Sequence, residues 1–489
     1  MEWGFYGRRL ELQQLAAILE RRRWFFVKVT GRRRIGKTSL IQQALLAARS
    51  KGIQQGILYV QIPDSGPAGV VSAVVDAMDT FHLPDSIARP ASLDDVAKLV
   101  STLARLGYVI ALDEFQYFNR EHLKDFPSLL QREVDLLSAG AARVPGGLLV
   151  LGSVHTDIQA LLEHQSAPLF SRTTGEIDLT HLDLSSVLEI LNEHATPDPQ
   201  RLLFLWSLFE GVPKFYRDCY EQGVLSAGRG ELLRKLFFES SSPLRTEADN
   251  WFLKELRGRY DVVLKHVARN EGCNHGEITD YVRRMSRDTE EQVAGYLKIL
   301  IERYRLIERK LPVFAKPKTP RGRYYLTDNF LAAWLAALAN PVSAIAFSPT
   351  DQLVVEADQR MRDVEGHAFE KLVERLYEER SKKRIGDFPL SRRIDGYWDS
   401  SDTEIDLVAM DETSKRIRFG TCKRSEDKLL KDVTNFEGHV SRFLETYPGY
   451  KKWKIEKAAL SPELTPEARR HLQGAGLIPQ DLADLLLGL

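Results

Sequence analysis

The chain has 489 residues, which corresponds to about three domains at roughly 150 residues each. Hydrophobic residues make up 43% and charged residues 28% of the sequence, the balance that is typical of globular proteins. The formal net charge is zero. The overall charge therefore indicates no partner, and any surface for nucleic acid must be a local patch.

Cysteine usage and hydropathy argue against several classes of protein. The three cysteines are far apart and form no CxxC or Cys/His cluster, so neither a disulfide framework nor a zinc site is expected. The N-terminus is charged and has no signal-peptide core. The most apolar stretch, residues 330–347, contains Asn340 and Pro341 and predicts a buried helix rather than a membrane span. We expect a cytoplasmic protein without a membrane partner.

The first 180 residues alternate apolar runs with segments of helical periodicity. This pattern predicts an α/β fold in which helices cover a parallel sheet. The runs expected to form strands are Trp24–Thr30, Gly56–Ile62, Tyr108–Leu112 and Leu148–Ser153.

A glycine-rich segment joins the first of these strands to a helical segment. Gly31 and Gly36 allow the backbone N–H groups to face phosphate oxygens, and the helix N-terminus adds a favourable dipole. Lys37 is expected to reach the β- and γ-phosphates, and the Thr38 hydroxyl to bind Mg²⁺. The residues predicted to surround the nucleotide here are Gly31, Arg32, Arg33, Arg34, Ile35, Gly36, Lys37, Thr38 and Ser39.

Polar residues end the third and fourth of these strands. Asp113 and Glu114 end the strand that begins at Tyr108. We expect Asp113 to hold the magnesium hydration shell and Glu114 to polarise the attacking water. Ser153 ends the next strand, where it is placed to sense the γ-phosphate. Arg172 is a candidate for stabilising transition-state charge, in its own site or across a subunit interface.

Several motifs together resemble one known group of proteins. They are Phe5-Tyr-Gly-Arg8 with Glu11-Leu12, the arginine-rich GRRRIGKT loop, Asp113-Glu-Phe-Gln116, Gly152-Ser153, Pro168-Leu-Phe-Ser-Arg172 and Gly211-Val-Pro213. The set resembles the archaeal-type ATPases of the STAND class, relatives of the AAA+ ATPases. The resemblance covers nearly the whole chain, including a winged helix and a C-terminal PD-(D/E)xK nuclease-like domain.

The resemblance implies ATP and Mg²⁺ as ligands, and it implies roles for further residues. Ser153 would be a sensor residue and Arg172 an arginine finger or phosphate sensor. Pro213 would couple a helical lid to the nucleotide. Phe5, Tyr6 and Arg8 match the group's N-terminal motif, which lies near the base of the bound nucleotide. Members of this group are nucleotide-driven switches, which implies exchange of ATP for ADP and a nucleotide-dependent homo-oligomer or a protein partner.

The middle of the chain predicts a winged helix. Residues 260–270, 275–284 and 290–304 have apolar residues at helical spacing. Two strand-like runs follow and flank a Pro/Gly turn rich in basic residues: Arg309, Lys310, Lys316, Lys318, Arg321 and Arg323. A basic wing is suited to grip the phosphates of double-stranded DNA. The alternative is an internal regulatory module, which the acidic Glu290, Glu291 and Glu302 of the third helix favour.

The C-terminal part predicts a helix, an acid-bearing strand, a turn and a strand that ends in lysine, an order similar to the PD-(D/E)xK nuclease core. By this resemblance Asp406 matches the metal-binding aspartate, Lys423 the lysine, and Glu370 the helix glutamate. Thr421 stands where the second strand carboxylate is expected, and a threonine hydroxyl is a weaker ligand for a hard cation. Either Glu370 or Glu404 replaces that ligand, or metal binding is weakened and the domain serves DNA binding or assembly.

These observations divide the chain into an ATPase core (1–180), a helical lid (181–250), a winged helix (251–347), a linker (348–360) and a nuclease-like α/β domain (361–489). The main hypothesis is an ATP-hydrolysing switch associated with nucleic acid. One alternative is an ATP-regulated, Mg²⁺-dependent DNA endonuclease. Another is a scaffold that binds nucleotide with negligible turnover, against which Glu114 argues.

Overall fold

The computed structural model divides into two compact units, and each is described here by itself. One unit contains residues 4–181 and 212–214, and the other contains residues 1–3, 182–211 and 215–489. The structure describes residues 2–52, 55–153, 155–196, 198–248, 256, 258–286 and 289–489. Within these ranges, no helix combines the length and the apolar character needed to cross a membrane.

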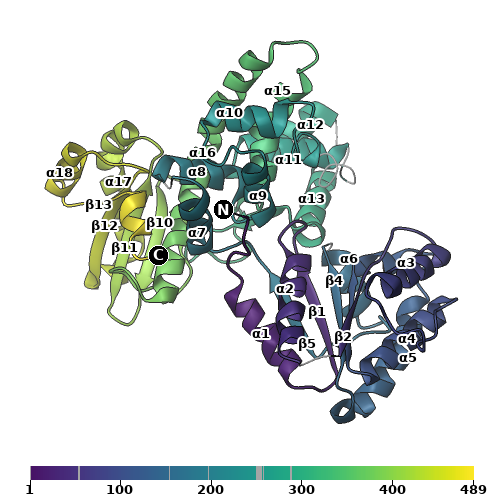
Figure 1. The fold of residues 1–489 in the computed structure, drawn as a ribbon. Helices are drawn as coiled ribbons and strands as arrows, with labels where there is room; N and C mark the ends of the chain where they lie inside the picture. Colours follow the sequence, from purple (N-terminus) through teal and green to yellow (C-terminus); the bar gives the residue numbers. More distant parts are fainter. Residues whose placement is uncertain are drawn as a thin grey trace. The chain divides into compact units, whose positions relative to one another are not determined.

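The first unit is a parallel sheet of five strands in the order β2-β3-β4-β1-β5 (Figure 1). The four expected strands are present, and β5 is a fifth that the sequence analysis did not assign. The strands are β1 (Phe25–Gly31), β2 (Gly56–Gln61), β3 (Tyr108–Asp113), β4 (Gly147–Gly152) and β5 (Gly175–Leu179). The helices are α1 (Arg9–Glu20), α2 (Lys37–Ser50), α3 (Pro67–Thr80), α4 (Leu93–Arg105), η1 (Phe115–Asn119), α5 (Phe126–Ala139), η2 (Ala141–Arg143) and α6 (His155–Leu162).

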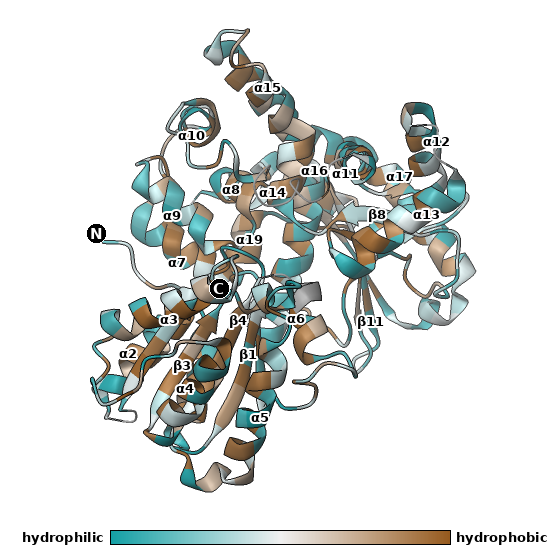
Figure 2. Ribbon diagram, turned by 90° about the vertical axis from the view of Figure 1, so that its right-hand side faces the viewer, coloured by the Kyte–Doolittle hydropathy of each residue, from teal (hydrophilic) through white to brown (hydrophobic). Residues whose placement is uncertain are grey.

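Burial explains why these segments form a sheet covered by helices. Every residue of β1 and β4 is buried, as expected for parallel strands whose two faces are both covered. Strands β1, β3 and β4 are largely coloured as hydrophobic, and α4 and α5 carry both hydrophobic and hydrophilic colours (Figure 2). The N-terminus of α4 is capped by Ser92, whose side chain accepts a hydrogen bond from the Asp95 N–H.

The second unit begins with a helical region and continues with a small three-stranded sheet. The helices up to this sheet are α7 (Leu184–His194), α8 (Pro199–Phe209), α9 (Pro213–Glu221, whose first two residues belong to the first unit), α10 (Arg229–Leu233), η3 (Arg234–Phe238), α11 (Arg259–Arg269), α12 (His275–Ser286), α13 (Glu290–Lys298) and η5 (Ile299–Arg303). The sheet has the order β6-β8-β7 and is antiparallel. Its strands are β6 (Cys273–Asn274), β7 (Ile307–Lys310) and β8 (Arg323–Leu326).

The prediction of a linker at residues 348–360 is wrong, because most of this segment belongs to one long helix. After α14 (Asn329–Ala333), η6 (Trp334–Leu338) and α15 (Ala339–Ser343), helix α16 runs without a break over Thr350–Lys383. Leu353, Val354, Ala357 and Met361 recur at helical spacing and are buried. The polar residues of this stretch lie mainly on the solvent-facing side of the helix.

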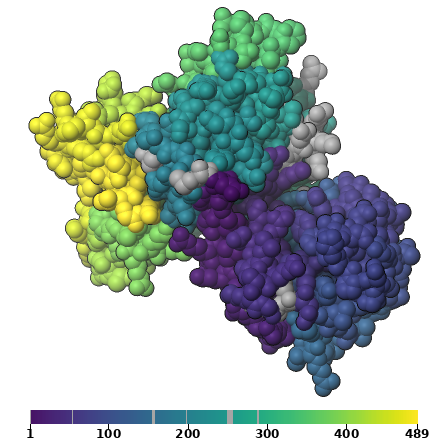
Figure 3. Space-filling view, viewed as in Figure 1, coloured from purple at the N-terminus to yellow at the C-terminus, as the bar shows by residue number. Residues whose placement is uncertain are grey.

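The C-terminal domain is a mixed five-stranded sheet in the order β13-β12-β11-β10-β9, with helices on both faces. Its light green and yellow atoms adjoin one another in Figure 3. Side chains of α16 and α19 pack on one face and those of α17 and α18 on the other. The elements are β9 (Asp395–Trp398), β10 (Glu404–Asp411), β11 (Arg416–Cys422), α17 (Glu426–Thr446), η7 (Pro448–Lys452), β12 (Lys454–Leu460), α18 (Pro466–Gly474), β13 (Ile478–Gln480) and α19 (Leu482–Leu486).

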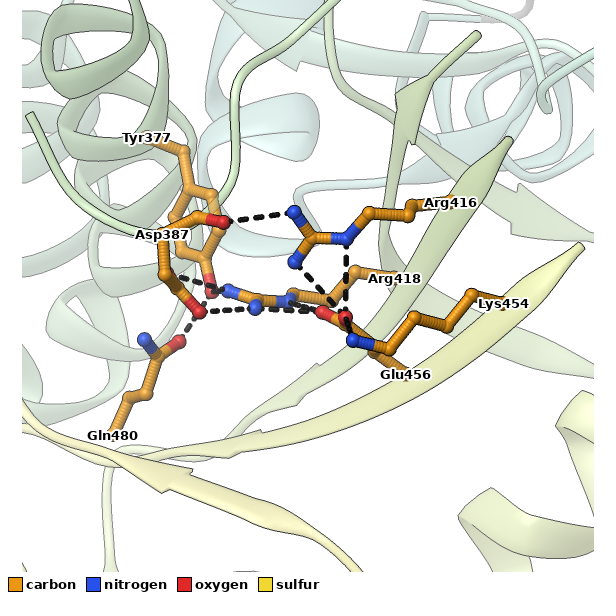
Figure 4. Close-up of polar contacts among 7 residues, drawn as sticks. All are labelled: Tyr377, Asp387, Arg416, Arg418, Lys454, Glu456 and Gln480. Carbon is orange, nitrogen blue, oxygen red and sulfur yellow. Dashed lines mark hydrogen bonds and ion pairs between the residues drawn. The ribbon is translucent and has the colours of Figure 1, made fainter. Parts of the chain in front are cut away.

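A buried charged cluster lies within this domain (Figure 4). The Arg418 side chain is only 1% exposed and donates to Glu456 Oε2 from Nη2 at 2.7 Å and from Nε at 3.0 Å. It also donates to Asp387 Oδ2 at 2.5 Å and to the Tyr377 hydroxyl at 3.3 Å. Arg418 and Glu456 are direct partners in the register of β11 and β12. The guanidinium therefore joins the two strands and the segment that follows α16.

Candidate functional site

The glycine-rich loop forms a closed turn between β1 and α2. Gly31 has φ 145° and Gly36 has φ 94°, conformations that an L residue rarely adopts. A Cβ at Gly31 would lie 2.6 Å from the Leu179 carbonyl oxygen. Only glycine therefore fits position 31. Around these positions Ile35 is buried, Arg32 and Arg34 are half-buried, and Arg33 and Ser39 are exposed.

Lys37 points back into this loop. Its Nζ donates to the carbonyl oxygens of Gly31 at 2.9 Å and Arg32 at 3.1 Å. Burial lowers the pKa of Lys37 to about 8, and the charges of Asp113 and Glu114 only partly oppose that shift. The loop thus holds a buried ammonium group whose charge an anion would stabilise.

Residues from two strands and a helix meet beside the lysine. The Thr38 hydroxyl donates to Asp113 Oδ2 at 2.8 Å, although the two residues are 75 positions apart. The Tyr59 hydroxyl of β2 donates to the same oxygen at 2.5 Å. Burial, and then the hydrogen bond with Asp113, raise the pKa of Tyr59, so the phenol stays a donor. The two side chains predicted to hold Mg²⁺ are therefore in contact.

Glu114 and Ser153 are linked by a residue that the sequence analysis left without a role. Gln116 donates from its Nε2 to Glu114, and the same nitrogen lies 3.5 Å from the Ser153 hydroxyl oxygen. Glu114 has φ 56°, a conformation that is uncommon for a residue other than glycine. Gln116 follows β3 within the motif Asp113-Glu-Phe-Gln116, and this position was the one sequence feature that could have indicated a role for it.

The N-terminal motif lies against the base of the loop. Arg8 is buried, and its Nη2 donates to the carbonyl oxygens of Ile35 at 3.2 Å and Thr180 at 2.6 Å. Tyr6 is also buried, whereas Phe5 is 36% exposed. Pro213 lies close to Gly36 of the loop, since a Cβ at Gly36 would be 3.6 Å from its Cγ. Arg8 thus holds the loop through its backbone.

Arg172 is engaged elsewhere in the same unit. Its guanidinium forms a two-point ion pair with Asp135 of α5, at 2.8 and 3.1 Å, and donates to the Phe170 carbonyl oxygen at 3.0 Å. These contacts join Arg172 to α5 rather than to Lys37, Thr38 or Asp113. A role in charge stabilisation would require the ion pair with Asp135 to open.

We expect Tyr59→Phe to raise the Mg²⁺ concentration needed for half-maximal ATP turnover by about 10–100-fold, because groups that orient a metal ligand have effects of this size. The measurement is ATP turnover as a function of Mg²⁺. The matched control is Tyr108→Phe, which removes a hydroxyl from the opposite end of β3. An unchanged Mg²⁺ dependence in Tyr59→Phe would show that this hydroxyl does not position Asp113.

The C-terminal domain brings three of the residues predicted for a nuclease centre into one polar pocket. Glu370, Glu404 and Asp406 all line it. Asp406 Oδ2 accepts from the Cys422 N–H at 2.7 Å and from Lys423 Nζ at 3.2 Å. Burial, and then the charge of Asp406, raise the pKa of Glu370 well above its usual value. Burial also raises the pKa of Asp406.

A carboxylate that sequence reasoning missed stands beside the unexpected threonine. Thr421 Oγ1 donates to Asp432 Oδ2 of α17 at 3.0 Å, and Lys423 Nζ lies 3.6 Å from the same oxygen. In the part of the chain that the structure describes, no three His, Cys, Asp or Glu side chains are grouped closely enough to hold a metal ion. Lys423 instead lies between the two aspartates as their common cation.

Comparisons with known proteins agree with this architecture. The chain is 26% identical over 442 residues to an uncharacterised protein of Methanocaldococcus jannaschii, MJECL04, an alignment that covers 88% of this chain and 91% of the relative. The structure of a Walker-type ATPase of Pyrococcus abyssi, PABY2304, aligns with a TM-score of 0.52 and 18% identity, over 68% of this chain and 96% of that one. A family described as archaea bacterial proteins of unknown function matches residues 334–435. The parallel α/β sheet thus has the fold of a P-loop ATPase, and the family match spans the candidate centre of the C-terminal domain.

Proposed function

We propose that this protein is an ATP-binding and ATP-hydrolysing switch of the STAND class that associates with nucleic acid. The observation that carries the proposal is the contact between Thr38 and Asp113 beside the buried Lys37. A lone glycine-rich turn does not require a buried lysine or an acid at the end of a neighbouring strand. Binding of a triphosphate explains all three.

The residues of this site fit their proposed ligands. Lys37 is a desolvated cation whose hydrogen-bond acceptors are two neutral carbonyl groups, so a phosphate is the missing counter-charge. The Thr38 hydroxyl and the Asp113 carboxylate are the hard oxygen ligands that Mg²⁺ prefers. When bound, Mg²⁺ would neutralise charge that develops on the phosphates. The Tyr59 hydroxyl orients the carboxylate.

Glu114 and Gln116 supply the chemistry of hydrolysis in this proposal. Glu114 would act as the general base that accepts the proton of the attacking water. Gln116 holds Glu114 through its amide nitrogen and connects it to Ser153. A change at the γ-phosphate would thus reach both β3 and β4. This pair of contacts favours turnover over a scaffold that only binds nucleotide.

The test of this function is ATP turnover by the purified chain with and without double-stranded DNA, at a fixed salt concentration. Mg²⁺-dependent turnover that DNA stimulates supports both parts of the proposal. Turnover without a response to DNA supports an ATPase that works with a protein partner or a second copy of the chain. Absence of turnover would contradict the assignment as a hydrolase.

A Mg²⁺-dependent DNA endonuclease is the second candidate, favoured by Glu370 and Asp406, which line one pocket, and by the hydrogen bond from Lys423 to Asp406. Two carboxylates would hold the ion and the lysine would support developing charge. Cleavage of plasmid DNA that requires Mg²⁺ and disappears in Asp406→Ala would establish this activity. Cleavage that persists in Asp406→Ala would assign the nuclease to another site or to a contaminant.

A further inference from the structure

The basic hairpin of the middle domain, residues 307–326, is docked on the C-terminal domain. The Val313 N–H donates to the Gly396 carbonyl oxygen at 2.8 Å, and the Trp398 indole N–H donates to the Arg321 carbonyl oxygen at 2.7 Å. Both hydrogen bonds join the hairpin turn to β9. The hairpin therefore lies along the edge strand of the C-terminal sheet.

Apolar side chains anchor the turn of this hairpin. Val313 is 3% exposed and belongs to the hydrophobic core between the sheet and α17. Phe314 stacks on Tyr450, with ring centroids 5.3 Å apart and planes 9° apart. Burial of this kind, rather than surface ion pairs, usually supplies most of the free energy of docking. Loss of an ion pair alone should thus leave the hairpin in place.

Most of the basic residues that favoured DNA contact form ion pairs or hydrogen bonds within the chain. Lys310 Nζ lies 3.2 Å from Glu374 of α16. Arg323 pairs with Glu404 of β10, and its guanidinium carbon lies 4.7 Å over the Trp398 ring. Arg309 donates to the carbonyl oxygens of Pro317 and Thr319 in its own turn.

These contacts place the hairpin cations at the candidate nuclease centre. Lys310, Arg323 and Tyr325 line the same pocket as Glu370 and Asp406. The hairpin is therefore one wall of that pocket. The side chains of Lys310 and Arg323 are 23% and 26% exposed, so they are only partly accessible to a ligand outside.

We propose that Glu374 and Glu404 mask a phosphate-binding surface formed by Lys310 and Arg323, so that the backbone of duplex DNA and the acidic pocket compete for the same two cations. The proposal extends the nucleic-acid association proposed above and does not depend on ATP turnover. A phosphate is a suitable competitor because both cations are held by carboxylates, which it can replace as an anionic acceptor. The masked state is the one seen here.

The test compares how binding of a short DNA duplex depends on salt. Each protein cation that neutralises a phosphate adds about 0.9 to the slope of log K against log salt. In the double variant Glu374→Gln, Glu404→Gln, the slope should steepen by about 1.8, for two released cations. The matched control is Glu412→Gln, Glu445→Gln, which removes the same charge at two exposed positions and should leave the slope unchanged.

The converse variant separates masking from a change in overall charge. Lys310→Ala, Arg323→Ala should leave the slope unchanged in the otherwise wild-type chain but lower it by about 1.8 in the Gln background. If the slope fell by that amount in the wild-type background, the two cations would already bind phosphate. If the slopes of the Gln variant and its control were equal, the carboxylates would mask nothing. Absence of duplex binding by every variant would also overturn the proposal.

Two further measurements separate masking from detachment of the hairpin and from loss of ATP turnover. Hydrogen exchange at residues 307–326 should be unchanged in the Gln variant, because Val313 and Phe314 still anchor the turn. Faster exchange there would mean that the carboxylates hold the hairpin rather than mask it. ATP turnover of the same variants reports the proposed ATPase separately, so a chain without turnover can still show the salt effect.

Discussion

Lys37→Ala is expected to lower ATP turnover by about 10²–10³-fold, the effect of removing one pre-organised donor to developing charge. Lys37 is the one buried ammonium group that the described P-loop residues contain, and it lies within hydrogen-bonding distance of two loop carbonyl oxygens. Alanine leaves neither charge nor donor at that position. The measurement is the steady-state rate at saturating ATP and Mg²⁺.

The matched control is Lys51→Ala, at the other end of α2. Its side chain is 61% exposed, and its ion pair with Glu20 spans 3.5 Å, so its removal should leave the rate unchanged. A near-wild-type rate in Lys37→Ala would assign the observed hydrolysis to another protein or site. An equal loss in both variants would point to a general effect of the substitutions on folding.

Arg418→Met is expected to lower the stability of the C-terminal domain by about 3–5 kcal/mol, because removal of one partner leaves a buried charge without its counter-ion. Glu456 is the residue left behind, with its side chain 8% exposed. Arg416 and Lys454 still contact Glu456, which places the expected loss toward the lower end of that range. The measurement is hydrogen-exchange protection of β11 and β12, which reports local stability in a chain of several domains.

Two further variants show whether the effect comes from the buried pair. Arg393→Met replaces an arginine that is 62% exposed and lies 3.9 Å from Glu378, so protection should not change. Adding Glu456→Gln to Arg418→Met should recover part of the loss, since the uncompensated charge is gone. A fully additive loss in the double variant would show that the two side chains are not energetically coupled.

The parts of the candidate site that were predictable are those set by local sequence. The loop from Gly31 to Thr38 is contiguous, and its strand-before and helix-after context can be read from apolar periodicity. Asp113 and Glu114 were predictable because the carboxyl ends of parallel strands meet at one edge of a sheet. Polar residues that directly follow a buried strand are therefore expected at that edge.

Other contacts could not be predicted, because they depend on which elements become neighbours. Tyr59 reaches Asp113 only because β2 pairs with β3 in register, with Gln61 opposite Asp113. A tyrosine in an apolar strand is otherwise an ordinary core residue. Asp432 meets Thr421 because α17 packs against β11. The linker prediction failed for a similar reason, since the burial that makes residues 350–360 helical comes from neighbours elsewhere in the chain.

The sequence by itself determined the α/β character of the first 180 residues, the glycine-rich loop, the strand-end acids and the basic hairpin, since each is encoded by residues that are adjacent or evenly spaced. Only the tertiary structure decided what those residues contact. It paired Arg172 with Asp135 and directed the hairpin cations toward Glu374 and Glu404. The sequence alone gives the charge of a side chain, but its ion-pair partner depends on which distant elements pack beside it.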